Sequence, residues 1–269
     1  MENNQSVSFR NSTILYRLYG TGKPVILIHG FGEDGNVWNY IAENLKTNFC
    51  LIIPDLPGSG ESEILKNDND QITIDDYAEV IIQIIKKESA HACTIIGHSM
   101  GGYITLSIAD KHPELLNGFG FFHSTAFADA EEKKKDRLKS IEFIQKHDSI
   151  SFLKTSVPGL FADKFKQERY DEVEKFIDSI KYFTGEALIQ YSTAMINRPE
   201  RVNVLKTTPL PVLFIIGEKD SAIPLEKSLQ QCHLPATVYV NILPEAGHMG
   251  MFEEKESSTG FILSYLNRL

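Results

Sequence analysis

The feature that most constrains this chain is a serine bracketed by glycines, between a strand-like run and a helical pattern. Residues 93–96, CTII, have the composition of a short buried strand, and the apolar residues of segment 100–109 recur at near-helical spacing. Between them, residues 97–101 read GHSMG and match the GxSxG pattern of a sharp strand-to-helix turn. The glycines remove side chains that would keep strand and helix apart. The pattern predicts that the Ser99 hydroxyl projects from the end of a sheet, beside the first amides of a helix.

Composition bounds the number of domains and excludes some partners. With 269 residues and 42% hydrophobic content, the chain is long enough for one large core, either as a single domain or with an inserted lid. The net charge of −9 argues against nucleic acid or an anionic membrane as a partner, because phosphate binding needs clustered Lys and Arg. The first twelve residues lack the apolar segment of a signal peptide, and no apolar run reaches the roughly 18 residues of a membrane span. We therefore expect a soluble, cytoplasmic protein that acts on a small molecule.

The cysteines give no sign of a disulfide framework. There are three, Cys50, Cys93 and Cys232, and the first two lie in strand-like runs, where a reduced and buried thiol is the expected state. Nothing in the sequence suggests a metal site either. We expect neither a metal nor a cofactor.

The order of the expected elements indicates a mostly parallel sheet. The expected strands are an antiparallel edge hairpin over 6–19 and buried runs at 24–28, 49–53, 93–96, 118–122, 211–216 and 237–243. The elements expected between the early strands are helices at 37–45 and 74–87 and a polar loop at 66–72. Strands separated by helices need right-handed crossovers, which build a parallel sheet. Ligands of such sheets bind beyond the carboxyl ends of the strands, where Ser99 is expected.

Five motifs together resemble the α/β-hydrolase fold family. They are HGFG at 29, DLPGSGES at 55, GHSMGG at 97, GEKD at 217 and EAGHMGMFEE at 245, and they span nearly the whole chain. The resemblance implies an α/β fold with a mostly parallel central sheet, flanked by helices, and an inserted helical cap. The expected core is residues 1–123 and 206–269. The expected cap, or lid, is residues 124–205, where charged helical patterns at 130–146, 168–183 and 185–196 replace strands.

A serine hydroxyl is a poor nucleophile at neutral pH, so Ser99 needs a base and a carboxylate that orients the base. Among eight histidines, His248 is best placed as the base, because it lies in a loop after the last expected strand. Asp220 follows the strand at 211–216 and matches the acid position of the family, in the chain order serine, acid, histidine. Glu218 is a rival carboxylate.

Other polar residues near the motifs are given supporting roles. His98 lies beside the nucleophile, and a packing or supporting role is expected for it rather than that of base. His29 is expected to brace the HGFG loop. His123 follows a strand and either faces the pocket or is an ordinary loop histidine. The resemblance implies a structural turn at Asp55.

The tetrahedral intermediate of acyl transfer carries an oxyanion, which needs two preorganised amide donors. The amide of Met100, directly after the nucleophile, is expected to be one donor. By resemblance, the second is the amide of Phe31. Gly30 and Gly32 let this loop turn towards the serine.

The expected cap covers the pocket and sets what fits into it. Its apolar side chains either line an acyl site or form the cap core: Phe127, Phe152, Leu160, Phe161, Phe165, Tyr191 and Met195. The side chains predicted to bind substrate are Phe127, Phe161 and Tyr191, together with His123. The EEKKK run at 131 is expected to be a solvated helix face.

These roles predict acyl transfer to water. We expect a serine hydrolase of the carboxylesterase kind, which cleaves small or medium acyl esters through an acyl-enzyme intermediate. A serine at position 99 argues against the dehalogenases and epoxide hydrolases of the family, which need a carboxylate there. The alternatives are a lactonase, a carbon–carbon bond hydrolase, an acyltransferase that excludes water, and a ligand receptor that retains the triad.

Overall fold

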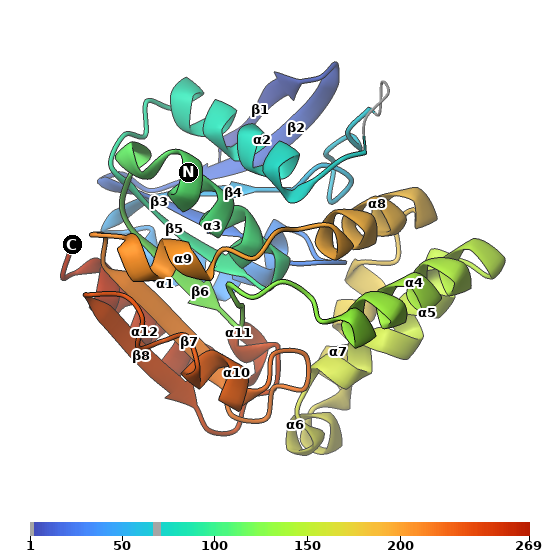
Figure 1. Ribbon diagram of the computed structural model, residues 1–269. Coiled ribbons are helices and arrows are strands. Elements are labelled where there is room, and N and C mark those ends of the chain that lie inside the picture. The colour runs from blue at the N-terminus through green and yellow to red at the C-terminus, as the bar shows by residue number, and fades with distance from the viewer. Residues whose placement is uncertain (1–2, 67–70) are drawn as a thin grey trace.

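An eight-stranded sheet forms the centre of the protein (Figure 1). The computed structural model describes residues 3–66 and 71–269, so most of the polar loop expected at 66–72 lies outside the described residues. The strands are β1 (Asn3–Phe9), β2 (Ser12–Tyr19), β3 (Lys23–Ile28), β4 (Phe49–Pro54), β5 (Cys93–His98), β6 (Leu116–Phe122), β7 (Val212–Gly217) and β8 (Val238–Leu243). Their order is β1-β2-β4-β3-β5-β6-β7-β8. The pairs β1–β2 and β2–β4 are antiparallel and all others are parallel, which confirms the predicted fold class and edge hairpin.

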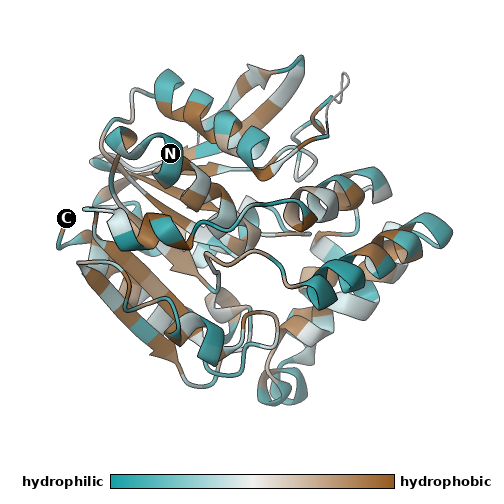
Figure 2. Cartoon of the chain, in the orientation of Figure 1, coloured by the Kyte–Doolittle hydropathy of each residue, from teal (hydrophilic) through white to brown (hydrophobic). Residues whose placement is uncertain are grey.

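The apolar runs become the centre of the sheet because they are covered on both faces. Every residue of β5 and of β7 is buried. Continuous burial of this kind is typical of parallel strands between two helical layers. The edge strand β8 instead mixes buried and exposed positions. Figure 2 shows the central strands as a brown, hydrophobic layer.

Helices cover the two faces of the sheet. One group of contacting elements contains the 3₁₀ helix η1 (Gly35–Trp38), α1 (Asn39–Leu45), α11 (Gly250–Glu253) and α12 (Lys255–Leu266). The other contains α2 (Ile74–Lys87), α3 (Met100–Lys111) and α9 (Val202–Thr207). Helix α2 has the bounds predicted from its isoleucine spacing, and a capping box between Thr73 and Asp76 fixes its start. Short elements η2 (Pro113–Leu115) and α10 (Leu225–Leu229) complete this part.

Residues 123–211, all of them described, contain helices and no strand. The helices are α4 (Glu131–Lys146), α5 (Ser149–Ser156), η3 (Val157–Leu160), α6 (Asp163–Glu168), α7 (Tyr170–Ser179) and α8 (Gly185–Ile196). Figure 1 shows α4, α5 and α7 gathered to one side of the sheet. The helix expected over 168–183 is wrong in extent, because Arg169 leaves the helical region at φ −136° and ψ 38° and separates α6 from α7. The boundaries of core and cap stay a prediction.

Candidate active site

The turn between β5 and α3 holds Ser99 in a strained backbone conformation. Its φ is 50° and its ψ is −114°, a region that residues with a side chain rarely adopt. A Cβ added at Gly97 would lie 2.2 Å from the carbonyl carbon of Gly101. One added at Gly101 would lie 2.4 Å from the carbonyl oxygen of Ile28. Both distances agree with the steric role predicted for the two glycines.

Gly97→Ala is expected to destabilise the fold by about 2 to 4 kcal/mol, because the new methyl group meets backbone atoms that have no room to move. Chemical denaturation of the purified variant measures this loss. Gly260→Ala is the matched control, since nothing lies within 4 Å of a Cβ added at Gly260 in helix α12. The control is expected to gain up to about 1 kcal/mol from helix propensity. Equal stabilities of the two variants would contradict the steric explanation.

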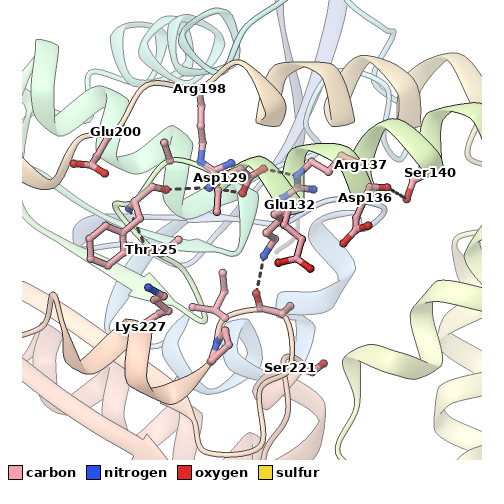
Figure 3. A pocket seen from close by; sticks show the side chains of 17 residues that line it. Thr125, Asp129, Glu132, Asp136, Arg137, Ser140, Arg198, Glu200, Ser221 and Lys227 are labelled. Atoms are coloured by element: carbon pink, nitrogen blue, oxygen red, sulfur yellow. Dashed lines mark hydrogen bonds and ion pairs between the residues drawn. The ribbon is translucent and has the colours of Figure 1, made fainter.

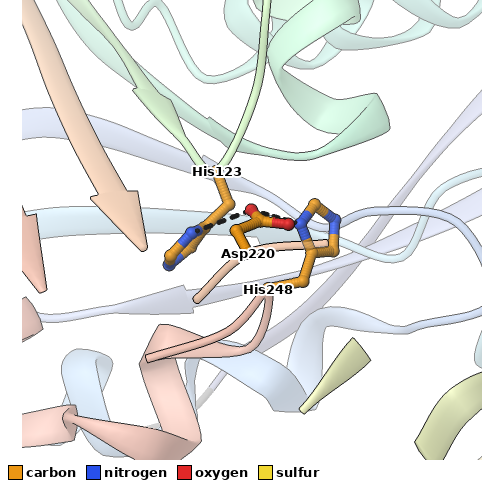
Figure 4. Close-up of side chains that lie close together, drawn as sticks. All are labelled: His123, Asp220 and His248. Atoms are coloured by element: carbon orange, nitrogen blue, oxygen red, sulfur yellow. Dashed lines mark hydrogen bonds and ion pairs between the residues drawn. The ribbon is translucent and has the colours of Figure 1, made fainter. Parts of the chain in front are cut away.

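His248, the predicted base, is held by the predicted acid Asp220 (Figure 4). His248 Nδ1–H donates to Asp220 Oδ2 at 2.8 Å. The other carboxylate oxygen, Oδ1, accepts hydrogen bonds from the amides of Ala222 and Ile223, each at 2.8 Å. Burial alone would raise the pKa of Asp220, but the neighbouring His248 holds it well below its usual range. The carboxylate is therefore ionised, and it fixes the orientation of the imidazole.

The rival carboxylate, Glu218, lies at the surface. Its side chain is 42% exposed and pairs with Lys219 at 2.8 Å. It accepts no hydrogen bond from a histidine among the described residues. The geometry therefore favours Asp220 over Glu218 as the acid.

His123 lies on the other side of Asp220 from His248 (Figure 4). Its Nδ1 is 3.3 Å from Asp220 Oδ2 and accepts a hydrogen bond from the Gly217 amide at 3.1 Å. Burial lowers the pKa of His123 to about 4, although Asp220 opposes this shift. The ring is therefore neutral at pH 7 and packs behind the carboxylate rather than facing a substrate.

The side chains of His123, Asp220 and His248 are also the only described group whose ligand atoms cluster as a metal site would, within 4.8 Å of one another. Two ligands of one tetrahedral zinc ion lie ~3.3 Å apart, given bonds of about 2.0 Å. The 2.8 Å between His248 Nδ1 and Asp220 Oδ2 is shorter than this and is a hydrogen-bond distance. We therefore interpret the cluster as a hydrogen-bonded group.

A buried Glu33–His98 pair connects the two loops that meet at Ser99. Glu33 Oε2 accepts from the Gly30 amide at 2.8 Å and from His98 Nδ1–H at 2.9 Å. His98 Nε2–H donates to the carbonyl oxygen of His248 at 2.9 Å. Burial opposes both charges, but each partner favours ionisation of the other, so the pKa of Glu33 is lowered and that of His98 is raised. Because both ring nitrogens face acceptors, the geometry fits an imidazolium ion.

His98, for which a supporting role is predicted, is thus paired with Glu33, a residue that no sequence motif identified. The available signal was an acidic residue directly after the HGFG loop. A sequence alone does not tell that this carboxylate turns inward, since acidic residues in loops are mostly exposed.

Glu33→Gln is expected to lower the free energy of unfolding by about 2 to 4 kcal/mol, because a neutral amide no longer stabilises the buried imidazolium of His98. We also expect kcat to fall by roughly 10-fold or more, because the Gly30 loop and the His248 carbonyl lose a shared anchor. Glu43→Gln on helix α1 is the control, since the Glu43 side chain is 63% exposed. Wild-type stability and kcat in Glu33→Gln would contradict the anchoring role.

The difference in the free energy of unfolding between wild type and Glu33→Gln is expected to change with pH in a defined direction. The pKa of Glu33 is lowered on folding, so its contribution is complete above its unfolded pKa of about 4.3 and is lost as the pH falls. The pKa of His98 is raised, so its contribution is complete below about pH 6.5 and is lost as the pH rises. The stability difference between wild type and Glu33→Gln is therefore expected to be largest between about pH 4.5 and 6.5.

The helical segment is tied directly to the loop that carries His248. The His248 amide donates to the carbonyl oxygen of Leu160 at 2.7 Å. Glu253 accepts from the Ala162 amide at 2.8 Å and from the Gly247 amide at 3.0 Å. The position of the predicted base thus depends on residues at 160–162 as well as on the sheet.

The residues predicted to form the oxyanion hole both lie near Ser99. Met100 is the first residue of α3, where amides have no acceptor within the helix. Phe31 lines the same cavity as Ser99 and His248. His29 accepts a hydrogen bond from the Leu56 amide at 2.9 Å, which agrees with the bracing role expected for it.

A cavity of about 130 Å³ lies at Ser99 and His248. Its other lining residues are Phe31, Glu33, Tyr103, Lys133, Arg137, Leu160, Met195, Ala222 and Ile223. Four of these, Lys133, Arg137, Ala222 and Ile223, also line an outer groove of about 900 Å³ (Figure 3). The small cavity therefore adjoins a larger groove between α4 and the loop that follows Asp220.

The predicted substrate contacts need correction. None of His123, Phe127, Phe161 and Tyr191 lines the Ser99 cavity, although Phe127 lines the outer groove. Phe161 and Tyr191 are 4% and 0% exposed and pack in the apolar core. Of the other apolar residues considered, Leu160 and Met195 do line the cavity. Helical spacing identifies a buried face but not which of its residues border an empty space.

The solvated face expected at residues 131–135 is wrong at Lys133, the residue of this run that lines the cavity. Lys133 is half-buried and lines both the cavity and the groove. Its neighbour Lys135 is exposed as expected. Lys133 and Lys135 differ in burial because residues on one face of a helix recur every three or four positions.

Comparison with known proteins agrees with this architecture. A family described as alpha/beta hydrolase fold matches residues 23–140. The chain is 27% identical over 253 residues to the dihydrolipoyllysine-residue acetyltransferase component of the acetoin cleaving system of Pseudomonas putida, a match that covers 92% of this chain and 64% of that protein. Three uncharacterized mycobacterial proteins are 31% identical over 102 residues, or 38% of this chain and 29% of their own length. The chain thus spans less than two thirds of the length of these relatives.

Two further matches cover most of both chains. A 2-hydroxy-6-oxo-6-(2'-aminophenyl)hexa-2,4-dienoic acid hydrolase from Metapseudomonas resinovorans is 26% identical, over 93% of this chain and 86% of that protein. The solved structure of a thermophilic esterase from Thermogutta terrifontis superimposes with a TM-score of 0.90 at 24% identity, over 100% of this chain and 98% of that chain. No helix within residues 3–66 and 71–269 has the length and apolar character to cross a membrane. From its sheet order, its serine turn and these matches, the chain has the α/β-hydrolase fold.

Proposed function

We propose that this protein is a serine hydrolase that cleaves small or medium acyl esters through an acyl-enzyme intermediate. The observation that carries the proposal is that Ser99 and His248 line one cavity, while an ionised Asp220 holds His248 at 2.8 Å. A strained serine, an oriented imidazole and a buried carboxylate are the parts that nucleophilic acyl transfer needs.

The proposed reaction has two halves. Ser99 Oγ attacks the ester carbonyl while His248 Nε2 takes the hydroxyl proton, and the Asp220 carboxylate stabilises the resulting imidazolium. The amides of Phe31 and Met100 stabilise the oxyanion. His248 returns the proton to the leaving alcohol, and water, activated by the same imidazole, then hydrolyses the acyl-enzyme.

The size of the cavity supports a short acyl group. About 130 Å³ of space at Ser99 is small beside the 900 Å³ of the outer groove. We propose that the reacting group enters the cavity and that the remainder of the substrate lies in the groove.

Other activities occur among the proteins that this chain resembles. The Metapseudomonas resinovorans relative is named as a hydrolase of a dienoic acid, and a solved structure that superimposes with a TM-score of 0.88 is an enol-lactonase from Burkholderia xenovorans LB400. The Pseudomonas putida relative is named as an acetyltransferase component. A lactonase, a carbon–carbon bond hydrolase and an acyltransferase are therefore the competing activities.

Hydrolysis of p-nitrophenyl esters from acetate to palmitate tests the proposal, with product release followed beyond one equivalent. We expect sustained turnover that falls as the acyl chain lengthens, because the cavity is small. Absence of turnover would contradict ester hydrolysis and direct the test to lactones and carbon–carbon substrates. A single burst of one equivalent would instead indicate the ligand receptor.

A further inference from the structure

Two cations of helix α4 line both the Ser99 cavity and the outer groove. They are Lys133 and Arg137, four residues apart and therefore on one face of the helix. The proposed reaction gives neither of them a role. Positive side chains beside a reacting serine in a chain of net charge −9 need a specific reason.

Lys133 has no carboxylate partner among the described residues. Its Nζ donates one hydrogen bond, to the carbonyl oxygen of Ala222 at 2.7 Å. An ammonium group has three donors, so two remain for a ligand. The contact with Ala222 also holds the half-buried side chain against the loop that follows Asp220.

Arg137 keeps part of its guanidinium free. Its Nε donates to Asp129 Oδ2 at 2.6 Å, and its side chain is 19% exposed (Figure 3). In the part of the chain that the structure describes, its two terminal nitrogens have no protein acceptor. These paired donors match the two oxygens of a carboxylate.

Arg198 belongs to the same cluster of charges, but its terminal nitrogens are bound to protein acceptors and are not available to a ligand. It donates to Asp129 Oδ1 at 2.9 Å and to the carbonyl oxygens of Met195 and Phe127, and it lies 3.8 Å from the centre of the Tyr103 ring. Asp129 is 6% exposed and faces both arginines, which hold its pKa low although burial opposes this. One carboxylate between two guanidinium groups leaves one positive charge uncompensated.

The acidic groups nearby do not cancel this excess. Glu33 also lines the cavity, but it is paired with His98. The acids of the outer groove, Glu132, Asp136 and Glu200, are exposed, and Asp136 pairs with Lys139 at 2.8 Å. Lys133 contributes one positive charge, and Arg137 and Arg198 around Asp129 leave another. About two positive charges therefore remain where the cavity meets the groove.

We propose that the substrate carries a carboxylate that binds Arg137 and Lys133 at this junction. The inference rests on the proposed function and names its substrate class: short esters with a second, anionic group. The ester carbonyl lies at Ser99, and the free carboxylate accepts hydrogen bonds from the terminal nitrogens of Arg137 and from Lys133 Nζ. Hydrolysis leaves the anionic group unchanged, while water adds to the acyl group and the alcohol leaves with a proton.

Matched esters separate this inference from general esterase activity. One pair is the monoethyl ester of glutaric acid and its analogue in which a carboxamide replaces the carboxylate. A second pair places the same two groups on the alcohol side, as butyryl glycolate and butyryl glycolamide. We expect wild-type kcat/KM to be roughly 10-fold or more higher for the carboxylate member in at least one pair, measured by pH-stat at low salt.

Substitutions in helix α4 test which residues cause the preference for the carboxylate ester. Lys133→Gln and Arg137→Gln are each expected to reduce the ratio of the two kcat/KM values by roughly 5-fold or more. Lys135→Gln removes the same charge from the exposed face of the helix and is expected to keep the wild-type ratio. The ratio is informative even if a variant loses general activity, because both esters react at the same serine.

A preference for the carboxamides, or a preference that survives both inward variants, would overturn the inference while leaving the serine hydrolase intact. If neither ester is turned over, calorimetric titration of Ser99→Ala with each pair gives the answer. Tighter binding of the carboxylate member, weakened by Lys133→Gln, supports the anion site. Equal binding of both members overturns it.

Discussion

Ser99→Ala is expected to lower kcat/KM for the best ester substrate by roughly 10⁴-fold or more, because it removes the hydroxyl that attacks the ester in the proposed reaction. The variant is expected to keep the fold. The residue has φ 50°, so serine and alanine carry the same backbone strain, and the hydroxyl makes no hydrogen bond within the described residues. Steady-state kinetics and thermal unfolding measure the two effects.

Ser257→Ala on the exposed side of α12 is the matched control for this variant and is expected to behave as wild type. Retention of more than about one hundredth of the activity in correctly folded Ser99→Ala would contradict the role of Ser99 as nucleophile.

Asp220→Asn is expected to have the second large effect, a loss of about 10⁴-fold in kcat. The reason lies in the two oxygens of Asp220. Oδ1 accepts from the amides of Ala222 and Ile223, so the asparagine oxygen is held at that position and its NH₂ group faces His248 Nδ1. His248 Nδ1 must then accept a hydrogen bond, which places the ring proton on Nε2 and prevents that atom from taking the Ser99 proton.

Glu218→Gln is the control, because it makes the same chemical change at the rival carboxylate, which lies at the surface. It is expected to change kcat by less than about twofold. A large loss of kcat in Glu218→Gln, together with a small loss in Asp220→Asn, would show that Glu218 and not Asp220 is the catalytic acid.

The sheet and the serine turn were predictable because local sequence determines them. Continuous apolar runs such as 24–28 and 211–216 are typical of strands buried on both faces, and they are observed within β3 and β7. The turn at Ser99 needs glycine at fixed offsets, and a Cβ at Gly97 or Gly101 would collide with backbone. Such constraints act between residues close in sequence, so they can be read without the fold.

The lining of the cavity was not predictable, because it depends on contacts between distant segments. Helix geometry places Lys133 on an inward face, but the carbonyl oxygen that accepts its hydrogen bond lies 89 residues later, at Ala222. Glu33 is buried because His98, 65 residues away, neutralises its charge. The apolar character of Tyr191 and Phe161 predicts positions in the pocket, but the same character serves equally well in a packed core, where they lie.

The proposed function depends above all on Ser99 being a nucleophile activated by His248. The most direct measurement is mass spectrometry of the protein after reaction with a fluorophosphonate, which phosphonylates an activated serine. We expect one adduct per chain, on the peptide that contains Ser99, with no adduct in Ser99→Ala and slow labelling in His248→Ala. Labelling of a different residue, or labelling that is equally fast in His248→Ala, would contradict the account.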